Sequence, residues 1–164
     1  MAKKVKIFSI KDGHIPSDFV HSAVDHLTAA QALFETNPSH YDSAGYIAHI
    51  GVELLLKAWL LELAGEFEGV HRLEVLYSAL AAKHGAPQLT QEQTGLVQTL
   101  DQFEQLRYPN RKQPIEVGDE HWAEIKEFVG FICRSMPEAI PAALDQAEFG
   151  RKGGRVLMQK KNAE

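Results

Sequence analysis

The stretch that decides the fold is IAHIGVELLLKAWLLEL, residues 47–63, the most apolar part of the chain. Its apolar residues recur every three or four positions, a spacing that predicts a helix. They form two rows, made of Ile47, Ile50, Leu54, Ala58 and Leu61 and of Val52, Leu56, Trp59 and Leu63. A helix that is apolar on two sides belongs at the centre of a bundle. We expect it to begin near residues 39–42 and to end at Ala64, with Gly65 as its C-terminal cap.

The same periodicity predicts helices on both sides of this stretch. One begins at Ser17, taken as its N-cap, and stops at Asn37-Pro38. A second covers about residues 71–83 and ends at Gly85. A third opens with a capping box at Thr90 and continues through Leu106 to Pro109. The last is capped by Asp119 and broken at Pro137.

A short further helix through Leu144 completes the expected elements, and apolar and polar residues alternate only in the short segment VKIFSI, residues 5–10. The sequence therefore predicts an all-α protein, an up-and-down helical bundle of four to five long helices plus a short C-terminal helix. We expect an N-terminal extension over residues 1–16, the bundle over residues 17–149 and a basic C-terminal tail over residues 150–164.

Length and composition limit the class of protein. The chain has 164 residues, enough for one domain, and its 45% apolar and 24% charged residues are typical of a soluble globular protein. Cys133 is the single cysteine, so neither an internal disulfide nor a cysteine-rich zinc site can form. The first residues lack the apolar run of a signal peptide, and residues 47–63 contain too many charges for a membrane span. We expect a cytoplasmic protein.

Charge is distributed unevenly. The net charge is −5, but residues 1–11 carry four lysines and residues 150–164 carry five basic residues against one acidic residue. Each end is therefore +4, which leaves −13 for residues 12–149. Such an acidic central region disfavours nonspecific binding to DNA or RNA over a broad surface. We expect the basic ends to be frayed and solvated, with a local contact to a polyanion as the alternative.

The central helix carries a polar seam on its otherwise apolar surface. His49, Glu53 and Lys57 follow one another at four-residue spacing, so they lie on one side of the helix. One interpretation is a simple ion pair between Glu53 and Lys57 at a solvated site. The other is that the seam lines a cleft or a dimer interface, because charges inside a bundle need partners.

Arg107-Tyr108-Pro109-Asn110 is the second candidate site. A guanidinium beside an aromatic ring suits a phosphate and a base, and Arg111 adds positive charge. The alternative is ordinary helix-end chemistry, with Arg107 near the negative end of the helix dipole and Tyr108 packed on the core. We expect no metal and no cofactor, because the histidines lack the spacing of known metal motifs and the chain has no glycine-rich phosphate loop.

Three motifs together resemble a HEPN domain. They are GVELLLKA at residues 51–58, His71-Arg72-Leu73, and LRYP at residues 106–109, and the resemblance covers about residues 17–136. It implies a four- or five-helix bundle that is often dimeric. It also implies nucleotide or RNA binding, a nucleotidyltransferase partner, or a place in a toxin–antitoxin or phage-defence system.

Many HEPN nucleases use an arginine followed by a histidine after four to six residues, a pattern that this chain lacks. Arg107 and Arg111 precede His121 by thirteen and nine intervening residues, and Arg72 precedes His84 by eleven. We therefore assign no catalytic residues. A pairing of Arg107 with His71 or His121 would need the fold to bring the side chains within hydrogen-bond reach.

These observations lead to three hypotheses. The first is a noncatalytic nucleotide- or RNA-binding module, a homodimer, in which Arg107 holds phosphate, Tyr108 stacks on a base, and Lys57 or Arg111 adds charge. The second is a divergent, metal-independent endoribonuclease. The third is a structural bundle whose apolar face docks another protein, such as a nucleotidyltransferase. The candidate binding residues are Arg107, Tyr108, Asn110, Arg111, Lys57, Glu53, His49 and His71.

Overall fold

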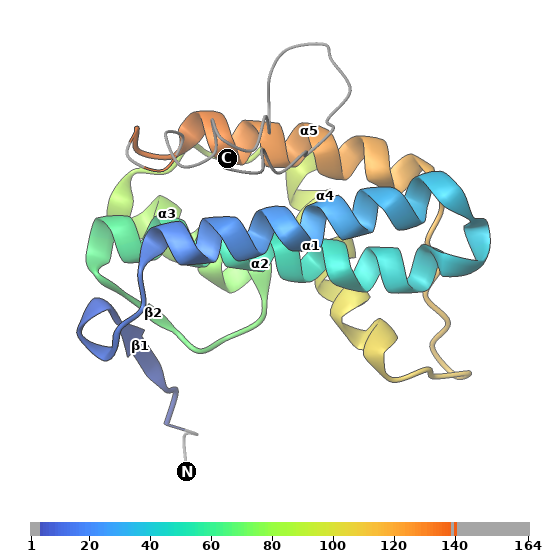
Figure 1. The fold of residues 1–164 in the computed structure, drawn as a ribbon, viewed down its shortest axis with the longest axis horizontal. Coiled ribbons are helices and arrows are strands. Elements are labelled where there is room, and N and C mark those ends of the chain that lie inside the picture. The colour runs from blue at the N-terminus through green and yellow to red at the C-terminus, as the bar shows by residue number, and fades with distance from the viewer. Residues whose placement is uncertain (1–3, 139, 141–164) are drawn as a thin grey trace, which may run out of the picture.

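The computed structural model describes residues 4–138 and 140 and shows a helical bundle built around one long helix (Figure 1). The helices are α1 (Pro16–Thr36), α2 (Tyr41–Ala64), α3 (Leu73–His84), α4 (Gln91–Phe103) and α5 (Glu120–Ser135). The prediction of an all-α bundle is confirmed. The short helix expected through Leu144, and the basic tail, lie outside the described residues.

Helix α2 is the centre of the bundle, as its two apolar rows predict. It contacts α1, α3, α4 and α5, and most of its residues from Ala44 to Leu61 are buried. Helices α1 and α2 lie side by side along the long axis of the molecule (Figure 1). Gly51 makes this close approach possible, since a Cβ atom there would lie 2.5 Å from Cγ of Leu27. None of the helices in the described part of the chain is long and apolar enough to cross a bilayer.

Most helix ends lie where local sequence signals place them. Gly65 and Gly85 adopt positive φ and cap α2 and α3, a conformation that costs glycine little. Thr90 caps α4, and its side chain and that of Gln93 form the reciprocal bonds of a capping box. The prediction for Ser17 is wrong: Ile15 is the N-cap of α1, because Pro16 supplies the first helical residue with a preset φ.

The end of α4 also differs from the prediction. The α-helix stops at Phe103 and tightens into a 3-10 turn, η3 (Glu104–Arg107), before Tyr108 becomes extended. Asp119 occupies the N-cap position of α5, but its side chain makes no capping hydrogen bond. The turn η3 packs against α2, so it fixes Arg107 beside the start of the central helix.

A small sheet ties the N-terminal segment to the bundle. Strand β1 (Ile7–Ser9) pairs antiparallel with β2 (Glu66–Glu68), and a 3-10 turn, η1 (Ile10–Asp12), follows. The rings of Phe8 and Phe67 stack at 5.3 Å between centroids. The expectation of a frayed N-terminus is therefore wrong for residues 7–12, where pairing with a distant segment overrides the weak local pattern.

Candidate functional site

The structure divides the eight candidate binding residues into two groups. One group is a polar cluster on and beside α2, buried except for His71, and the other lines a surface groove formed by η3 and the loop after it. The cluster consists of His49, Glu53, Lys57 and His71. The groove residues among the candidates are Arg107, Tyr108, Asn110 and Arg111.

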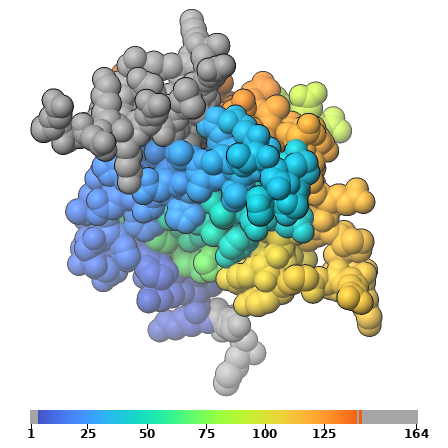
Figure 2. Space-filling model, turned by 45° about the vertical axis from the view of Figure 1, so that its right-hand side comes forward, coloured from blue at the N-terminus to red at the C-terminus, as the bar shows by residue number. Residues whose placement is uncertain are grey.

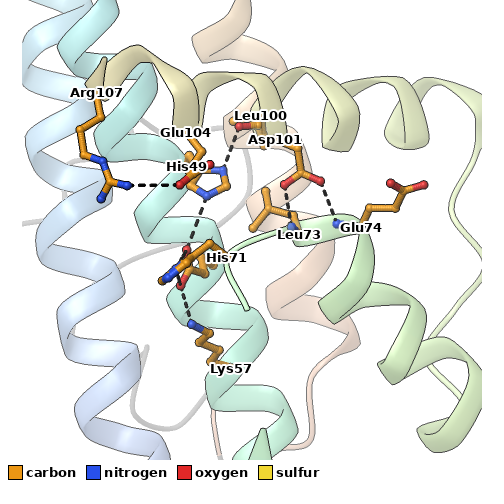
Figure 3. Close-up of polar contacts among 10 residues, drawn as sticks. His49, Lys57, His71, Leu73, Glu74, Leu100, Asp101, Glu104 and Arg107 are labelled. Atoms are coloured by element: carbon orange, nitrogen blue, oxygen red, sulfur yellow. Dashed lines mark hydrogen bonds and ion pairs between the residues drawn. The ribbon is translucent and has the colours of Figure 1, made fainter. Parts of the chain in front are cut away.

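The Glu53 carboxylate is the hub of the polar cluster, since His49, Lys57 and His71 all contact it. Figure 3 labels these three partners. Nζ of Lys57 lies 2.5 Å from Oε1 of Glu53, and Nδ1 of His71 donates to the same carboxylate at 3.1 Å. The ion pair between Glu53 and Lys57 therefore exists, but the interpretation as a solvated pair is wrong. Both residues are buried because α2 is covered on all sides, and Lys57 is only 6% exposed.

His49 links this cluster to α4. Its Nδ1 donates to the backbone carbonyl of Leu100 at 2.8 Å, and its Nε2 lies 3.5 Å from Oε2 of Glu53. Leu100 belongs to the last four residues of α4, whose carbonyls have no partner within an α-helix. A side chain of α2 therefore caps the end of α4.

Charge around Glu53 keeps its carboxyl ionised. Burial by itself raises the pKa of Glu53, because the charged form loses water. The contacts from His49 and Lys57, the positive charge of Lys57, and the contact from His71 outweigh burial. Together they lower the pKa of Glu53 from 4.5 to about 2.

Asp101, which the sequence analysis did not single out, helps to place His71. Its carboxylate accepts hydrogen bonds from the backbone N–H groups of Leu73 and Glu74, at 2.6 and 3.1 Å. Asp101 belongs to α4, yet it caps the N-terminus of α3, where free N–H groups favour a carboxylate. The start of α3 is thereby held against α4, two residues after His71. No sequence signal joins residues this far apart.

The surface groove has a volume of about 560 Å³. Its walls are η3, the loop of residues 108–115 and the beginning of α2, where Asp42 is the contributing residue. Figure 2 shows this face, on which the yellow and light orange surface of the loop stands beside the turquoise surface where α2 begins. Glu53, Lys57, His49 and His71 are not among the groove's lining residues.

Within the groove, a cation lies over an aromatic ring. Tyr108 is 71% exposed, so the alternative in which it packs on the core is wrong. The Arg107 guanidinium lies 4.9 Å from the Tyr108 ring centre, and its Nη2 lies 3.6 Å from Oε1 of Glu104. Asn110 accepts the N–H of Lys112 through its side-chain oxygen, which shapes the turn after Pro109.

No histidine joins Arg107 in the described part of the chain. The ion pair of Arg107 is with Glu104, and His71 contacts Glu53. His121 accepts the N–H of Gly118 at 2.9 Å and packs its ring edge-on against Phe103. Within the described residues, Arg107 therefore does not pair with His71 or His121.

Comparison with known protein families decides the classification. The family model described as the HEPN domain matches residues 17–137, most of the chain. The chain belongs to the HEPN family. No curated protein and no solved structure gives a significant match.

The family assignment bears on both groups of candidate residues, the polar cluster and the groove. A HEPN domain points to a nucleotide- or RNA-related function, and HEPN domains often form dimers. The matched region contains both the polar cluster and the groove. The cluster joins α2 to α4 and to the segment before α3, whereas the groove of this HEPN domain lies at the surface.

Proposed function

We propose that this HEPN domain binds a nucleotide or an RNA end in the groove beside Tyr108. The observation that supports the proposal is an exposed aromatic ring next to a half-exposed guanidinium. In this role Arg107 holds a phosphate group, Tyr108 stacks on the base, and Arg111, which also lines the groove, adds positive charge.

The chemistry of each side chain fits its role. Stacking of a base on an aromatic ring contributes about 1–3 kcal/mol, and it requires an open face such as that of Tyr108. A planar guanidinium binds a phosphate through two parallel hydrogen bonds, and the ion pair of Arg107 with Glu104 is long enough, at 3.6 Å, to leave donors free.

Size and charge favour a small ligand over a long polyanion. The groove volume lies in the range of small-molecule sites, roughly 300–1,000 Å³. Asp42 and Glu104 balance Arg107 and Arg111 along its walls. A duplex or a long strand would also meet the acidic body of the protein, which repels it.

Equilibrium binding of ATP, GTP and a short single-stranded RNA tests this proposal. We expect Arg107→Ala and Tyr108→Ala to weaken binding at least tenfold, and Tyr108→Phe to bind like the wild type because its ring is retained. Arg72→Ala is the matched control, since Arg72 is exposed, pairs with Glu74 and lies outside the groove. Equal affinities for wild type and Arg107→Ala, or no binding by the wild type, would refute the proposal.

The same samples separate binding from cleavage. Recovery of intact RNA, with and without added divalent metal, agrees with a binding module. Shortened RNA whose formation depends on Arg107 would instead support the divergent endoribonuclease.

A second proposal concerns an apolar hollow at the β1–β2 end of the bundle. Ile7 and Val75 are 46% and 39% exposed and line a hollow of about 360 Å³ together with Phe67. We propose that a second copy of the chain covers this face, because Lys83 and His84 line the same hollow as Glu66 and Glu68 and give it charges of both signs.

Sedimentation of wild type, Ile7→Lys and Val75→Lys tests this dimer. We expect a wild-type dimer and two monomeric variants, while Ile15→Lys, an equally exposed apolar position outside the hollow, stays dimeric. A monomeric wild type would refute the dimer and leave a different protein, such as a nucleotidyltransferase, as the candidate partner of this face.

A further inference from the structure

The groove contains acceptor-only groups that its proposed role in holding phosphate does not use. Asp42 and Glu104 both line it, and an ionised carboxylate only accepts hydrogen bonds. Glu104 is paired with Arg107. Asp42 is exposed and, within the described residues, its side chain makes no hydrogen bond or ion pair. A free carboxylate therefore stands in the same groove as the aromatic ring of Tyr108.

The position of Asp42 in the fold sets it apart from the other lining residues. It is the one residue that α2 contributes to the groove, whereas Arg107 and Tyr108 belong to η3 and the loop after it. When a base stacks on Tyr108 and its phosphate binds Arg107, the Watson–Crick edge of the base stays free. In this arrangement we take the α2 side of the groove, which Asp42 lines, as the side that this edge meets.

The bases differ in what that edge offers to a carboxylate. Guanine carries two adjacent donors, N1–H and the N2 amino group, which match the two oxygens of one carboxylate. Adenine carries one donor, the N6 amino group, beside the acceptor N1, which a carboxylate repels. Uracil presents one donor, N3–H, between two acceptors, and cytosine presents its N4 amino group beside the acceptors N3 and O2. A carboxylate at this place therefore favours guanine.

Three other polar side chains that line the groove are compatible with a preference for guanine. Gln105 and Gln113 can turn either end of their amides to a ligand, so they accommodate donors and acceptors alike. The side-chain oxygen of Asn110 is engaged by the N–H of Lys112. The acceptor-only group without a partner is Asp42.

We propose that the groove selects guanine, with the Asp42 carboxylate receiving N1–H and N2–H of the base. This inference rests on the proposed function and deepens it by naming the ligand class. Two sources share the same chemistry: a free guanine nucleotide and a guanosine at the end of an RNA strand.

Binding of GMP, AMP and IMP to wild type and Asp42→Asn tests the inference. We expect GMP to bind at least tenfold more tightly than AMP, and IMP, which lacks the N2 amino group, to lie between them. Asp42→Asn should bring GMP close to AMP and leave AMP unchanged or slightly tighter. Asp18→Asn is the matched control, because Asp18 is likewise an exposed acid in the first turn of its helix, α1.

The outcomes distinguish this inference from the proposed function. Equal binding of GMP and AMP, weakened for both by Tyr108→Ala, would overturn guanine selection and leave nucleotide binding standing. A guanine preference that survives in Asp42→Asn would overturn the role of Asp42. Absence of binding to every nucleotide and RNA would overturn both proposals.

Short RNAs identify the source of the guanine. Five-residue strands with one guanosine, placed at either end or in the middle, are compared with GMP. Tighter binding of an end-placed guanosine than of GMP assigns the groove to RNA ends, and tighter binding of GMP assigns it to the free nucleotide. Equal binding of strands with and without guanosine would contradict the inference.

Discussion

The Glu53 carboxylate and the Lys57 ammonium, one turn apart on α2, lie 2.5 Å from each other inside the bundle. On a surface helix such a pair contributes only a few tenths of a kcal/mol. Here both side chains are buried, and removing Lys57 leaves the charged carboxylate of Glu53 with the two histidines as its remaining contacts. The pair therefore matters to this domain mainly through the penalty for breaking it.

Lys57→Met should lower the free energy of unfolding by about 3–5 kcal/mol, because it removes the ammonium that pairs with the buried carboxylate of Glu53. Changing Glu53 to Leu in the same chain should restore part of this loss. The matched control is Arg72→Met, whose ion pair with Glu74 is exposed and should cost less than about 1 kcal/mol. Urea unfolding measures all four proteins. Similar losses for Lys57→Met and Arg72→Met would show that burial of the pair has no energetic consequence.

Acid should destabilise the domain partly through Glu53. A carboxyl whose pKa falls on folding stabilises the folded state above its ordinary value, here 4.5, and this contribution is lost as the pH falls through about 2. The shift corresponds to about 3 kcal/mol at neutral pH. We expect the unfolding free energies of wild type and Glu53→Gln to differ most at pH 7 and to converge toward pH 2. Curves that stay parallel over this range would contradict the lowered pKa.

NMR should detect the hydrogen bond from Nδ1 of His49 to the Leu100 carbonyl directly. We expect a slowly exchanging imidazole Nδ1 proton in the NMR spectrum. His49→Leu should remove this proton and about 1–3 kcal/mol of stability, since the Leu100 carbonyl then loses its partner on α2. His26→Leu serves as control, because His26 also contacts a backbone carbonyl, that of Ser22, but at the surface. A proton found on Nε2 alone would rule out the bond.

Two glycines on helices should respond in opposite directions to alanine. At Gly51 the new Cβ would meet the Leu27 side chain, so α1 and α2 must separate, and we expect a loss of about 1–3 kcal/mol. At Gly95 a Cβ meets nothing within 4 Å, so alanine should stabilise α4 by about 0.5–1 kcal/mol. Thermal unfolding of both variants is the measurement. Stabilisation by Gly51→Ala would mean that the two helices are not in close contact.

Part of the candidate site was predictable because its residues are neighbours in the chain. Arg107, Tyr108, Asn110 and Arg111 lie within five positions, and the same short segment lines one groove. Asp42 had no such signal, since it lies more than sixty positions away and looks like an ordinary acid at the start of a helix. Packing of η3 against α2 brings it to the groove.

The amino-acid sequence by itself determined the helices, most of their caps, the central position of α2 and membership in the HEPN family. These features depend on periodicity and on hydrogen bonds within about four residues, which a linear pattern records. Only the tertiary structure decided that β1 pairs with β2, that Lys57 is buried with Glu53, and that His49 caps α4. Each of these depends on which distant surfaces exclude water together, and that is a property of the packed chain.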